Sequence, residues 1–448
     1  MSVDQQHPLA MRAAAILQAN DTGTSIKASA DLYPHQWSWD AAFVSIGLAH
    51  ISIDRAVQEM RSLFRGQWQN GMLPHIVYNP DVPATAYFPD AARWDATKAS
   101  PDAPRDVATS GIIQPPVHAI AIRLICDRAE PEQARAIARE FYHPLLEWHR
   151  YLMSARDPES SGLVTIVHPW ESGMDNAPRW DAPLARIQVP EGELPPFERR
   201  DLAHVADPAQ RPTDADYDRY LWIVEVLKRG GYRVDRLRDA LPFRVKDSFV
   251  SAILVAANES LIRIADMADG DVDDLPIIES WIDRGRRGLA GQWDTGQDVC
   301  ADLDLVDGRP ISTRTIATFA PLIAGQVTTD TKAALIRLWH STAFTGHPDL
   351  RWPLPPVTSP EDPGFAPTRY WRGPVWPVMS WLLWWAWSRI GEDVVADKLR
   401  AAALEQVTAV GFAEYMHPFT GEALGSDDQS WTAAVVLDWL ASLESGTR

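Results

Sequence analysis

Residues 370–390, YWRGPVWPVMSWLLWWAWSRI, join two kinds of sequence that recur along this chain. The first part, YWRGPVWP, is polar and aromatic and is interrupted by glycine and proline. The second part, from residue 376 to 390, is apolar on nearly every side, which is typical of a helix buried inside a protein. Pro377 suits the first turn of this helix, and Gly391 suits its end. The stretch therefore predicts an interior helix whose N-terminus carries a motif with unusual chemistry.

Helical patterns dominate the rest of the chain. Roughly thirteen segments carry apolar residues at spacings of three and four with plausible ends. Strand patterns are sparse, and LVTIV at residues 163–167 is the clearest of them. The sequence shows no alternation of strands and helices, no repeat and no linker between domains. It predicts an all-α protein of about twelve helices, paired in hairpins as one domain over residues 1–448.

Motifs like YWRGPVWP precede other predicted helices as well. They are LYPHQWSWD (32–40), TSGIIQPPVH (109–118), RPTDADYDRY (211–220) and GSDDQSWT (425–432). If alternate helices form the inner ring of a barrel and run the same way, their N-termini open at one end, and the motifs converge on one pocket there. Asp, Ser and Pro are also common as simple helix caps. Caps do not require Trp, Tyr, Gln and Arg beside them, so the pocket is the favoured interpretation.

Composition excludes several classes of protein. The 448 residues carry a formal net charge of -18, which disfavours nucleic acids and anionic membrane surfaces as partners. We find no apolar run of the ~18 residues that a membrane-spanning helix needs, and the N-terminus does not resemble a signal peptide. Cys126 and Cys300 lie in apolar surroundings, without a disulfide framework. These features predict a cytoplasmic protein, and they leave its oligomeric state, a homo-oligomer included, open.

The residues that remain as candidates for chemistry are carboxylates and aromatic rings. The chain has no P-loop, no dinucleotide-binding glycine motif, no HExxH and no CxxC, so we expect no metal and no cofactor. Its 20 tryptophans are a high count. Aromatic rings with a polar edge suit the flat C–H faces of sugars, and carboxylates and amides suit their hydroxyl groups. Loop tryptophans are the candidates for a sugar-binding wall: Trp37, Trp39, Trp170, Trp180, Trp371 and Trp376.

Two acidic loops could supply a pair of carboxyl groups for cleavage of a glycosidic bond. Such cleavage needs one acid to protonate the leaving oxygen and one carboxylate to activate water or to attack. The loop HPWESGMDNAPRWD (168–181) offers Glu171, Asp175 and Asp181, and GFAEYMHPFTGE (411–422) offers Glu414 and Glu422. Spacing alone does not choose among these five residues.

Several blocks of the chain resemble the family 63 glycoside hydrolases. They are YPHQWSWDAAF, WESGMDNAPRWD, YDRYLW, YWRGPVWP, FAEY and GSDDQSWTAA. The likeness extends from about residue 10 to residue 440, and it is strongest to small bacterial members that hydrolyse glucosylglycerate or mannosylglycerate. It implies an (α/α)6 barrel with long loops over one end. It also implies an inverting mechanism in which Asp175 is the general acid and Glu414 is the general base.

The resemblance also implies how a small anionic glycoside is held. Residues matching the sugar ligands of the family are Tyr33, Trp37, Trp39, Asp40, Trp371, Trp376 and Gln429, and those matching the glycerate ligands are Tyr87, Gln114, Arg211 and Tyr217. Trp170, Glu171, Gly173 and Tyr370 complete the predicted substrate-binding set. Glu171 is expected either to bind the sugar or to support a residue that does. Arg211 makes physical sense, since an acidic protein needs a local guanidinium to bind a carboxylate.

The family pattern is weakest in two segments, residues 79–105 and 187–201, and we expect these to form lids over the glycerate end. The predicted substrate is 2-O-α-D-glucosylglycerate. Mannosylglycerate, which differs at C2, is an alternative on the same scaffold. A non-catalytic protein that binds a compatible solute is an alternative of another class, but it would have no need of both Asp175 and Glu414. A sugar epimerase would need a pair of histidines near the reacting carbon, and the sequence shows none so placed.

Overall fold

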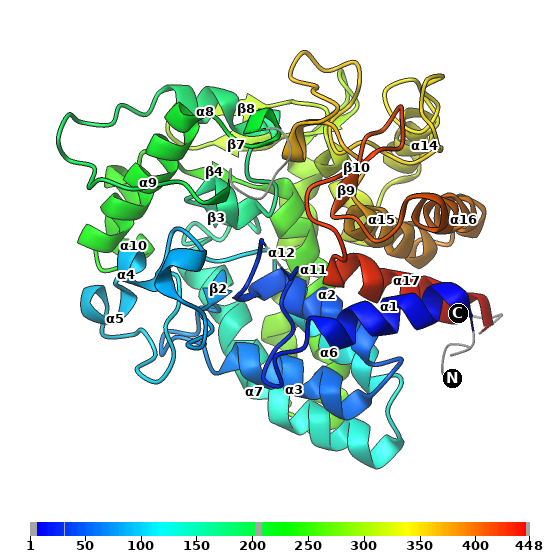
Figure 1. The fold of residues 1–448 in the computed structure, drawn as a ribbon, viewed down its shortest axis with the longest axis horizontal. Coiled ribbons are helices and arrows are strands. Elements are labelled where there is room, and N and C mark those ends of the chain that lie inside the picture. Colours follow the sequence, from blue (N-terminus) through cyan, green and yellow to red (C-terminus); the bar gives the residue numbers. More distant parts are fainter. Residues whose placement is uncertain (1–6, 31, 202–207, 445–448) are drawn as a thin grey trace.

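The structure is a computed structural model, which describes residues 7–30, 32–201 and 208–444 (Figure 1). It is mostly helical, which confirms the all-α class. The helices are α1 (Pro8–Ala19), α2 (Ser38–Leu48), α3 (Ile53–Phe64), α4 (Ala91–Trp94), α5 (Ala96–Ala99), α6 (His118–Cys126), α7 (Pro131–Ala155), α8 (Asp181–Ala185), α9 (Asp214–Arg229), α10 (Val234–Leu237), α11 (Ser248–Ala268), α12 (Leu275–Gly291), α13 (Ala320–Ile323), α14 (Thr329–Trp339), α15 (Pro377–Arg389), α16 (Asp393–Val410) and α17 (Ser430–Glu444).

The strands are short and form small antiparallel sheets. They are β1 (Gln36–Trp37), β2 (Ile76–Val77), β3 (Thr165–Ile166), β4 (Val245–Lys246), β5 (Trp293–Asp294), β6 (Val299–Cys300), β7 (Asp302–Asp304), β8 (Arg309–Ile311), β9 (Tyr415–Met416) and β10 (Ala423–Leu424). The largest sheet has the order β3-β4-β7-β8. The strand predicted at residues 163–167 is present as β3, although it is shorter than predicted.

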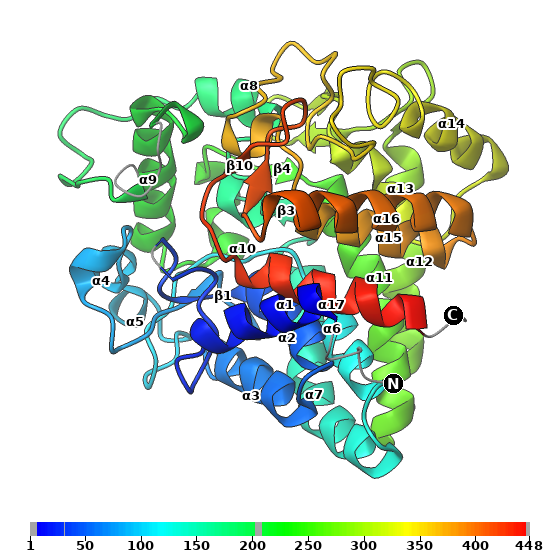
Figure 2. The same ribbon diagram turned by 45° about the vertical axis from the view of Figure 1, so that its right-hand side comes forward.

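Six helices contact one another in a closed order. This order is α2, α6, α11, α13, α15 and α17, and α17 packs back against α2. A second set lies outside them: α1 packs on α17, α3 on α2, α7 on α6 and α11, α12 on α11, and α16 on α15. Figure 2 shows α1 and α17 side by side and α16 beside α15. An inner ring with outer partners is the arrangement that the expected (α/α)6 barrel requires.

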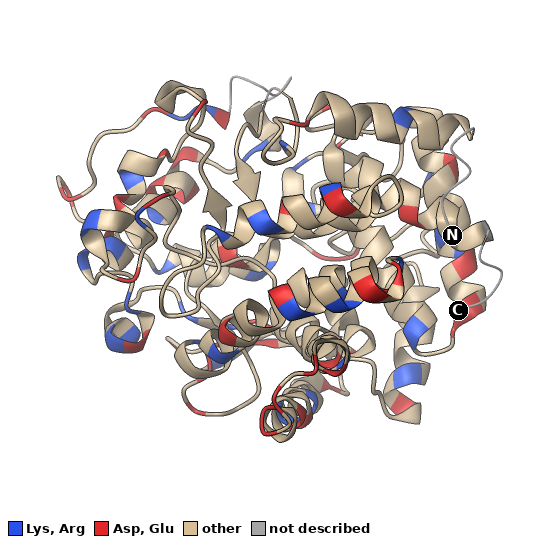
Figure 3. Ribbon diagram, turned by 90° about the horizontal axis from the view of Figure 1, so that it is seen from below, with Lys and Arg blue, Asp and Glu red and all other residues tan. Residues whose placement is uncertain are grey.

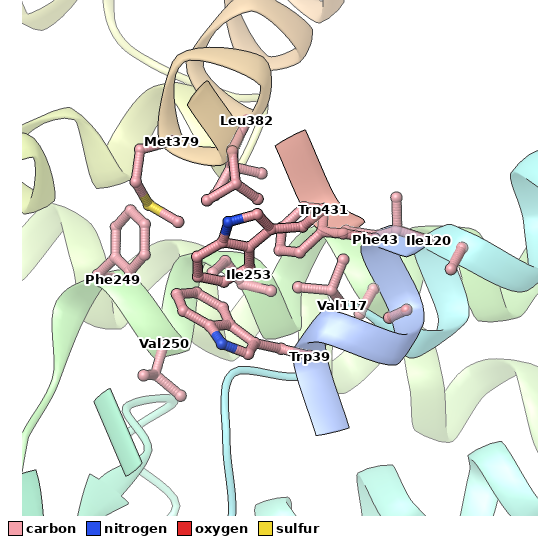
Figure 4. Packing of buried hydrophobic residues seen from close by; sticks show 14 of the residues in the cluster. Trp39, Phe43, Val117, Ile120, Phe249, Val250, Ile253, Met379, Leu382 and Trp431 are labelled. Atoms are coloured by element: carbon pink, nitrogen blue, oxygen red, sulfur yellow. The ribbon is translucent and has the colours of Figure 1, made fainter. Parts of the chain in front are cut away.

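The core lies between the inner helices. Every residue of α2 is buried, and so is every residue of α15 from Pro377 to Trp387. Figure 4 shows how Trp39 and Phe43 of α2 pack with Trp431 of α17 and with apolar side chains from the neighbouring helices. Trp39 and Trp431 also belong to the cavity described below, so the site is built directly on the packed core.

Helix α11 qualifies the expectation that no segment is long and apolar enough to cross a membrane. By length and composition alone it would pass that test. However, 83% of its most apolar stretch is buried inside the protein, and α11 contacts α6, α7, α12 and α13. Helix α11 is therefore a core helix of the barrel.

Charged residues of both signs are interspersed along the helices (Figure 3).

Helix α9 is the exception to the predicted pattern of motifs. The motif RPTDADYDRY does lead into a helix, but α9 lies with α4, α5 and α10 beside the barrel rather than in its inner ring (Figure 1). The helix begins at Asp214, inside the motif, because Thr213 and Asp216 form a capping box at its start. Such a motif thus indicates that the N-terminus of its helix faces the pocket. The motif does not show that the helix belongs to the inner ring.

Candidate active site

One cavity gathers nearly all of the residues that the sequence nominates. Its space, open mouth included, is about 790 Å³. Every predicted site residue lines it except Glu171 and Trp376. The lining members of the prediction are Tyr33, Trp37, Trp39, Asp40, Tyr87, Gln114, Trp170, Gly173, Asp175, Arg211, Tyr217, Tyr370, Trp371, Glu414 and Gln429.

The N-terminal ends of the inner helices bring these residues together. Asp40 lies in the first turn of α2, and Gln114 and Gln429 precede α6 and α17. Trp371 lies in the short helix η8 (Tyr370–Arg372) before α15. Glu414 immediately precedes β9, between α16 and α17. The prediction that the motifs converge on one pocket is therefore confirmed.

Glu414 has a hydrogen-bond donor at each of its two carboxylate oxygens. Its Oε1 accepts a hydrogen bond from the hydroxyl group of Tyr33 at 2.9 Å, and its Oε2 accepts one from the main-chain N–H of Ser426 at 3.0 Å. Nη2 of Arg211 lies 3.9 Å from Oε2. Burial raises the pKa of Glu414 above its usual value, while Arg211 and these donors act to lower it. The donors favour the ionised form, which is the form that a general base needs.

Asp175 has a different environment in the same cavity. It belongs to the loop after η2 (Pro169–Ser172), and its main-chain oxygen accepts a hydrogen bond from the Tyr220 hydroxyl at 3.1 Å. Burial raises the pKa of its carboxyl group to about 7, and the charge of Glu414 adds to this effect, while Arg211 opposes it. A large fraction of Asp175 is therefore protonated near neutral pH. The two carboxyl groups thus differ in their surroundings, since hydrogen-bond donors reach both side-chain oxygens of Glu414.

A third carboxyl group, that of Asp40, also faces the cavity. Burial raises its pKa to about 8, with a further contribution from the charges of Glu414 and Asp175. Three negative charges in one buried site repel one another, so the site holds protons at neutral pH. A protonated carboxyl group can both donate to and accept from a sugar hydroxyl group.

Arg211 is the buried cation of the site, with 5% of its surface exposed. Its Nη1 donates to the Tyr33 hydroxyl at 3.0 Å, and its guanidinium lies over the ring of Tyr370, 4.5 Å from the centroid. Its Nε and Nη2 are buried and have no hydrogen-bond partner among the described residues. Two neighbouring N–H groups of one guanidinium can bind a carboxylate with two parallel hydrogen bonds.

Aromatic rings form the walls of the cavity. The Trp39 and Trp371 rings lie 6.1 Å apart, and the Trp37 ring contacts those of Tyr33 and Tyr87 edge to face at 5.2 and 5.0 Å. Gly173 closes this wall from the acidic loop. It has a φ of +71°, and a Cβ atom there would lie 2.5 Å from the Trp39 ring. Only glycine lets the loop approach the tryptophan this closely.

Of the two roles expected for Glu171, the structure favours support of the site over contact with the sugar. Its side chain is fully buried, and its two oxygens accept hydrogen bonds from Arg156 at 2.7 Å each. The main-chain N–H groups of Ile113 and Val167 also donate to them, at 3.1 and 2.7 Å. With four donors satisfied, this carboxylate fastens the acidic loop to the barrel and does not face the cavity.

Trp376 and Trp180, which were candidates for the sugar-binding wall, do not line the cavity either. The Trp376 ring is fully buried behind that of Trp371, with centroids 3.6 Å apart and planes within 7°. The indole N–H of Trp376 donates to the Tyr370 carbonyl oxygen at 3.3 Å. Trp180 is also fully buried, and its indole N–H donates to the carbonyl oxygen of Met174 at 2.9 Å. The Trp376 ring thus supports the wall from behind, and Trp180 holds the acidic loop at Met174.

Some lining residues were not among the predicted ones. They are Leu32, His75, Phe88, Asp201, Pro212 and Trp431. Five of them lie within two residues of a predicted site residue in the sequence or in a predicted lid, so proximity to the motifs was the available signal. His75 has no such neighbour; it stacks on Trp170 with ring centroids 6.2 Å apart, and it reaches the cavity through the loop before β2.

The two predicted lids meet each other over the cavity. Phe88 and Phe197 stack with ring centroids 5.6 Å apart and planes within 3°. Phe197 also stacks on Tyr217 at 5.9 Å, and the Tyr217 hydroxyl donates to the carbonyl oxygen of Phe88 at 3.1 Å. Tyr87, next to Phe88, lines the cavity. These contacts join both segments to the start of α9. Residues 202–207, which follow, lie outside the described residues.

With this geometry, the similarity to known proteins identifies the family. Residues 33–432 match the model described as the mannosylglycerate hydrolase MGH1-like glycoside hydrolase domain. The chain belongs to this family. A glucosylglycerate hydrolase from Mycolicibacterium hassiacum is 46% identical to this MGH1-like chain over 438 residues, covering 96% of the chain and 97% of that protein. A mannosylglycerate hydrolase from Thermus thermophilus is 41% identical over 434 residues, covering 96% and 100%.

Solved structures agree with this assignment. The crystal structure of a family 63 mannosylglycerate hydrolase from Thermus thermophilus, in complex with Tris and D-glycerate, is similar to the MGH1-like chain with a TM-score of 0.88 at 40% identity. The match covers 96% of this chain and 100% of that one. A rhamnosidase from Klebsiella oxytoca, with a TM-score of 0.55 and 12% identity, shares the fold alone. The resemblance to family 63 glycoside hydrolases is therefore confirmed.

Proposed function

We propose that this glycoside hydrolase cleaves 2-O-α-D-glucosylglycerate to glucose and glycerate with inversion at the anomeric carbon. The observation that carries the proposal is the single cavity in which Asp175 and Glu414 accompany Arg211, a buried cation with unused N–H groups. A glycosidic bond and a carboxylate are the two features of this substrate that such a set of residues suits. The 46% identity to the Mycolicibacterium hassiacum glucosylglycerate hydrolase supports the glucosyl form.

In the proposed mechanism, Asp175 is the general acid and Glu414 is the general base. Glu414 takes a proton from a water molecule, whose oxygen attacks the anomeric carbon. Asp175 gives its proton to the glycosidic oxygen, the C–O bond breaks, and glycerate leaves with its hydroxyl group restored. Exchange of protons with water then returns Asp175 to the acid form and Glu414 to the carboxylate. The sugar is released first as the β anomer.

The glycerate end of the substrate is proposed to bind near Arg211. Its carboxylate would accept hydrogen bonds from Nε and Nη2, the two buried groups without partners among the described residues. Tyr87, Gln114 and Tyr217 line the same cavity and offer groups for the hydroxyl groups of glycerate. The Oε1 of Gln114 already accepts the main-chain N–H of Trp39 at 3.1 Å, which leaves its amide N–H groups as donors to a ligand.

The glucose ring is proposed to lie between the tryptophans of the wall. Trp37, Trp39 and Trp371 supply apolar faces, while Asp40 and Gln429 supply polar groups for the hydroxyl groups. The free, buried cysteines Cys126 and Cys300 fit a proposed location in the reducing cytoplasm.

Product analysis tests this proposal. Purified protein is incubated with 2-O-α-D-glucosylglycerate, the mannosyl analogue and neutral 2-O-α-D-glucosylglycerol, and proton NMR follows the sugar and its anomers from the first minutes. We expect glucose from the first substrate, with the β anomer appearing first. Initial release of α-glucose would rule out inversion, and no glucose from glucosylglycerate would rule out the function.

Mannosylglycerate remains the second candidate substrate, because the Thermus thermophilus mannosylglycerate hydrolase is 41% identical over the same length. The same assay compares kcat/KM for the two glycosides. A preference for the mannosyl substrate would keep the proposed chemistry and change the specificity. Tight binding without turnover of either substrate would instead favour a solute-binding protein.

A further inference from the structure

The hydroxyl group of Tyr33 lies at the centre of three polar contacts. It is 3.0 Å from Nη1 of Arg211, 2.9 Å from Oε1 of Glu414 and 3.2 Å from the hydroxyl group of Tyr370. Tyr33 therefore touches both the proposed carboxylate-binding group and the proposed general base. Arg211 and Glu414 also form an ion pair, with Nη2 3.9 Å from Oε2, but at this distance no hydrogen bond joins them directly.

Counting donors fixes the direction of these contacts. The guanidinium of Arg211 can only donate, and the carboxylate of Glu414 can only accept. The single proton of Tyr33 therefore points to Glu414, and its oxygen accepts from Arg211. The Tyr370 hydroxyl must then donate to the remaining lone pair of Tyr33. The result is a directed chain of hydrogen bonds from Arg211 through Tyr33 to Glu414.

This series of hydrogen bonds transmits the effect of the Arg211 charge to Glu414. A cationic donor to the phenol oxygen polarises its O–H bond and makes it a stronger donor to the carboxylate. This stabilises the ionised form of Glu414 and makes it a weaker base. The charge of Arg211 also acts to lower the pKa of both Glu414 and Asp175, against the larger raising effect of burial.

We propose that Tyr33 is a positioning residue that couples occupation of the Arg211 site to the strength of the general base, so that the carboxylate of the substrate assists the cleavage step as well as binding. When a carboxylate binds Nε and Nη2, its charge offsets that of the guanidinium. Tyr33 then donates less strongly, and Glu414 becomes a better base. This inference rests on the proposed function and adds a role for the anionic group of the substrate.

The coupling is tested with α-D-glucosyl fluoride, a neutral substrate whose small leaving group keeps the glycerate end of the cavity open. Its hydrolysis is measured by fluoride release across a range of pH, with and without saturating D-glycerate, whose binding is followed by tryptophan fluorescence. We expect D-glycerate to accelerate hydrolysis about fivefold or more above the acid limb of the pH profile, a coupling of ordinary size. We also expect it to move the acid limb to higher pH.

Tyr33→Phe keeps the aromatic ring and removes the hydroxyl group that links Arg211 to Glu414. We expect this variant to bind D-glycerate but to lose most of the acceleration and of the shift in the acid limb. Tyr142→Phe is the matched control, since the hydroxyl group of Tyr142 bonds Asp274, outside the cavity; it should behave as the unchanged protein does.

Three results would overturn the coupling: no binding of D-glycerate, binding without acceleration, or full acceleration in Tyr33→Phe. These outcomes are distinct from failure of the proposed function, which would show as no hydrolysis of glucosylglycerate itself. Hydrolysis of glucosylglycerate together with unchanged turnover of the fluoride would refute only the coupling.

Discussion

Replacing Glu171 by glutamine tests whether this residue acts in the sugar site, as the sequence predicts, or behind it, as the structure indicates. Glutamine keeps the size of the side chain but removes its charge and turns one acceptor into a donor. Arg156, also fully buried, would keep its charge without a partner. Breaking a buried ion pair from one side costs about 3–5 kcal/mol, and one of the two hydrogen bonds from Ile113 and Val167 is lost with the replaced oxygen.

This loss of stability can be converted into a shift of the unfolding temperature. At an unfolding entropy of about 2.1 cal/mol/K per residue, the 448 residues turn 3–5 kcal/mol into a decrease of roughly 3–5 °C. The assay is thermal unfolding followed by circular dichroism, together with kinetics on glucosylglycerate at a temperature where the variant is folded. We expect the lower unfolding temperature with KM changed less than about threefold, because a residue that does not face the cavity removes no ligand contact.

The matched control is Glu140→Gln. Glu140 pairs with Arg61 through two hydrogen bonds of 2.5 and 2.6 Å, but both side chains are largely exposed. Exposed pairs contribute about 0–1 kcal/mol, so this variant should unfold within about 1 °C of the unchanged protein. If Glu171→Gln left the unfolding temperature unchanged and raised KM by tenfold or more, Glu171 would be a substrate ligand and the structural interpretation would be wrong.

Three further predictions concern the chemistry. Glu414→Gln should lower kcat by about 10²–10⁴ while ligand affinity stays nearly constant, and near-normal rates in a stopped assay would remove Glu414 from the mechanism. Arg211→Ala should lower kcat/KM on glucosylglycerate about ten- to a hundredfold, the value of hydrogen bonds to a charged group, with a smaller effect on glucosylglycerol; equal losses on both substrates would make Arg211 structural. Because Asp175 must be protonated and its pKa is raised to about 7, activity should fall as pH rises through that region, and an alkaline limb that persists in Asp175→Asn would assign it to another group.

The convergence of the motifs could be predicted because it depends on a property of helices that is visible in the sequence. A polar and aromatic run before an apolar helix lies at the N-terminus of that helix, and inner helices that run the same way place their N-termini together. Asp40, Gln114, Trp371 and Gln429 reach the cavity for this reason. The same reasoning failed for α9, because nothing in its local sequence separates a ring helix from one that lies beside the barrel.

The predicted site residues that do not line the cavity lie close in sequence to predicted residues that do. Glu171 and Asp175 are four positions apart in one loop, and Trp371 and Trp376 are five positions apart. What separates the members of each pair is a contact that forms only in the folded protein. Arg156 neutralises Glu171, and the Trp371 ring covers that of Trp376. A side chain that faces the cavity and one that supports it from behind share the same composition, so sequence alone cannot separate them.

The negative charge of the protein explains why binding of an anionic substrate is proposed to depend on one arginine, Arg211. A chain with a formal net charge of -18 repels an anionic substrate, but salt screens exposed charges beyond about 8 Å under physiological conditions, so capture is decided by the groups inside the cavity. There, the carboxyl groups of Asp40, Asp175 and Glu414 accompany Arg211, the one arginine among the described residues that line it.

An anionic substrate adds a further negative charge, which raises the tendency of the carboxyl groups to hold protons. In the proposed mechanism, this change would favour the acid form of Asp175 and make Glu414 a stronger base. A neutral glycoside would leave the charge of Arg211 directed at both groups, so the same arginine that admits the correct substrate would also slow the cleavage of the wrong one.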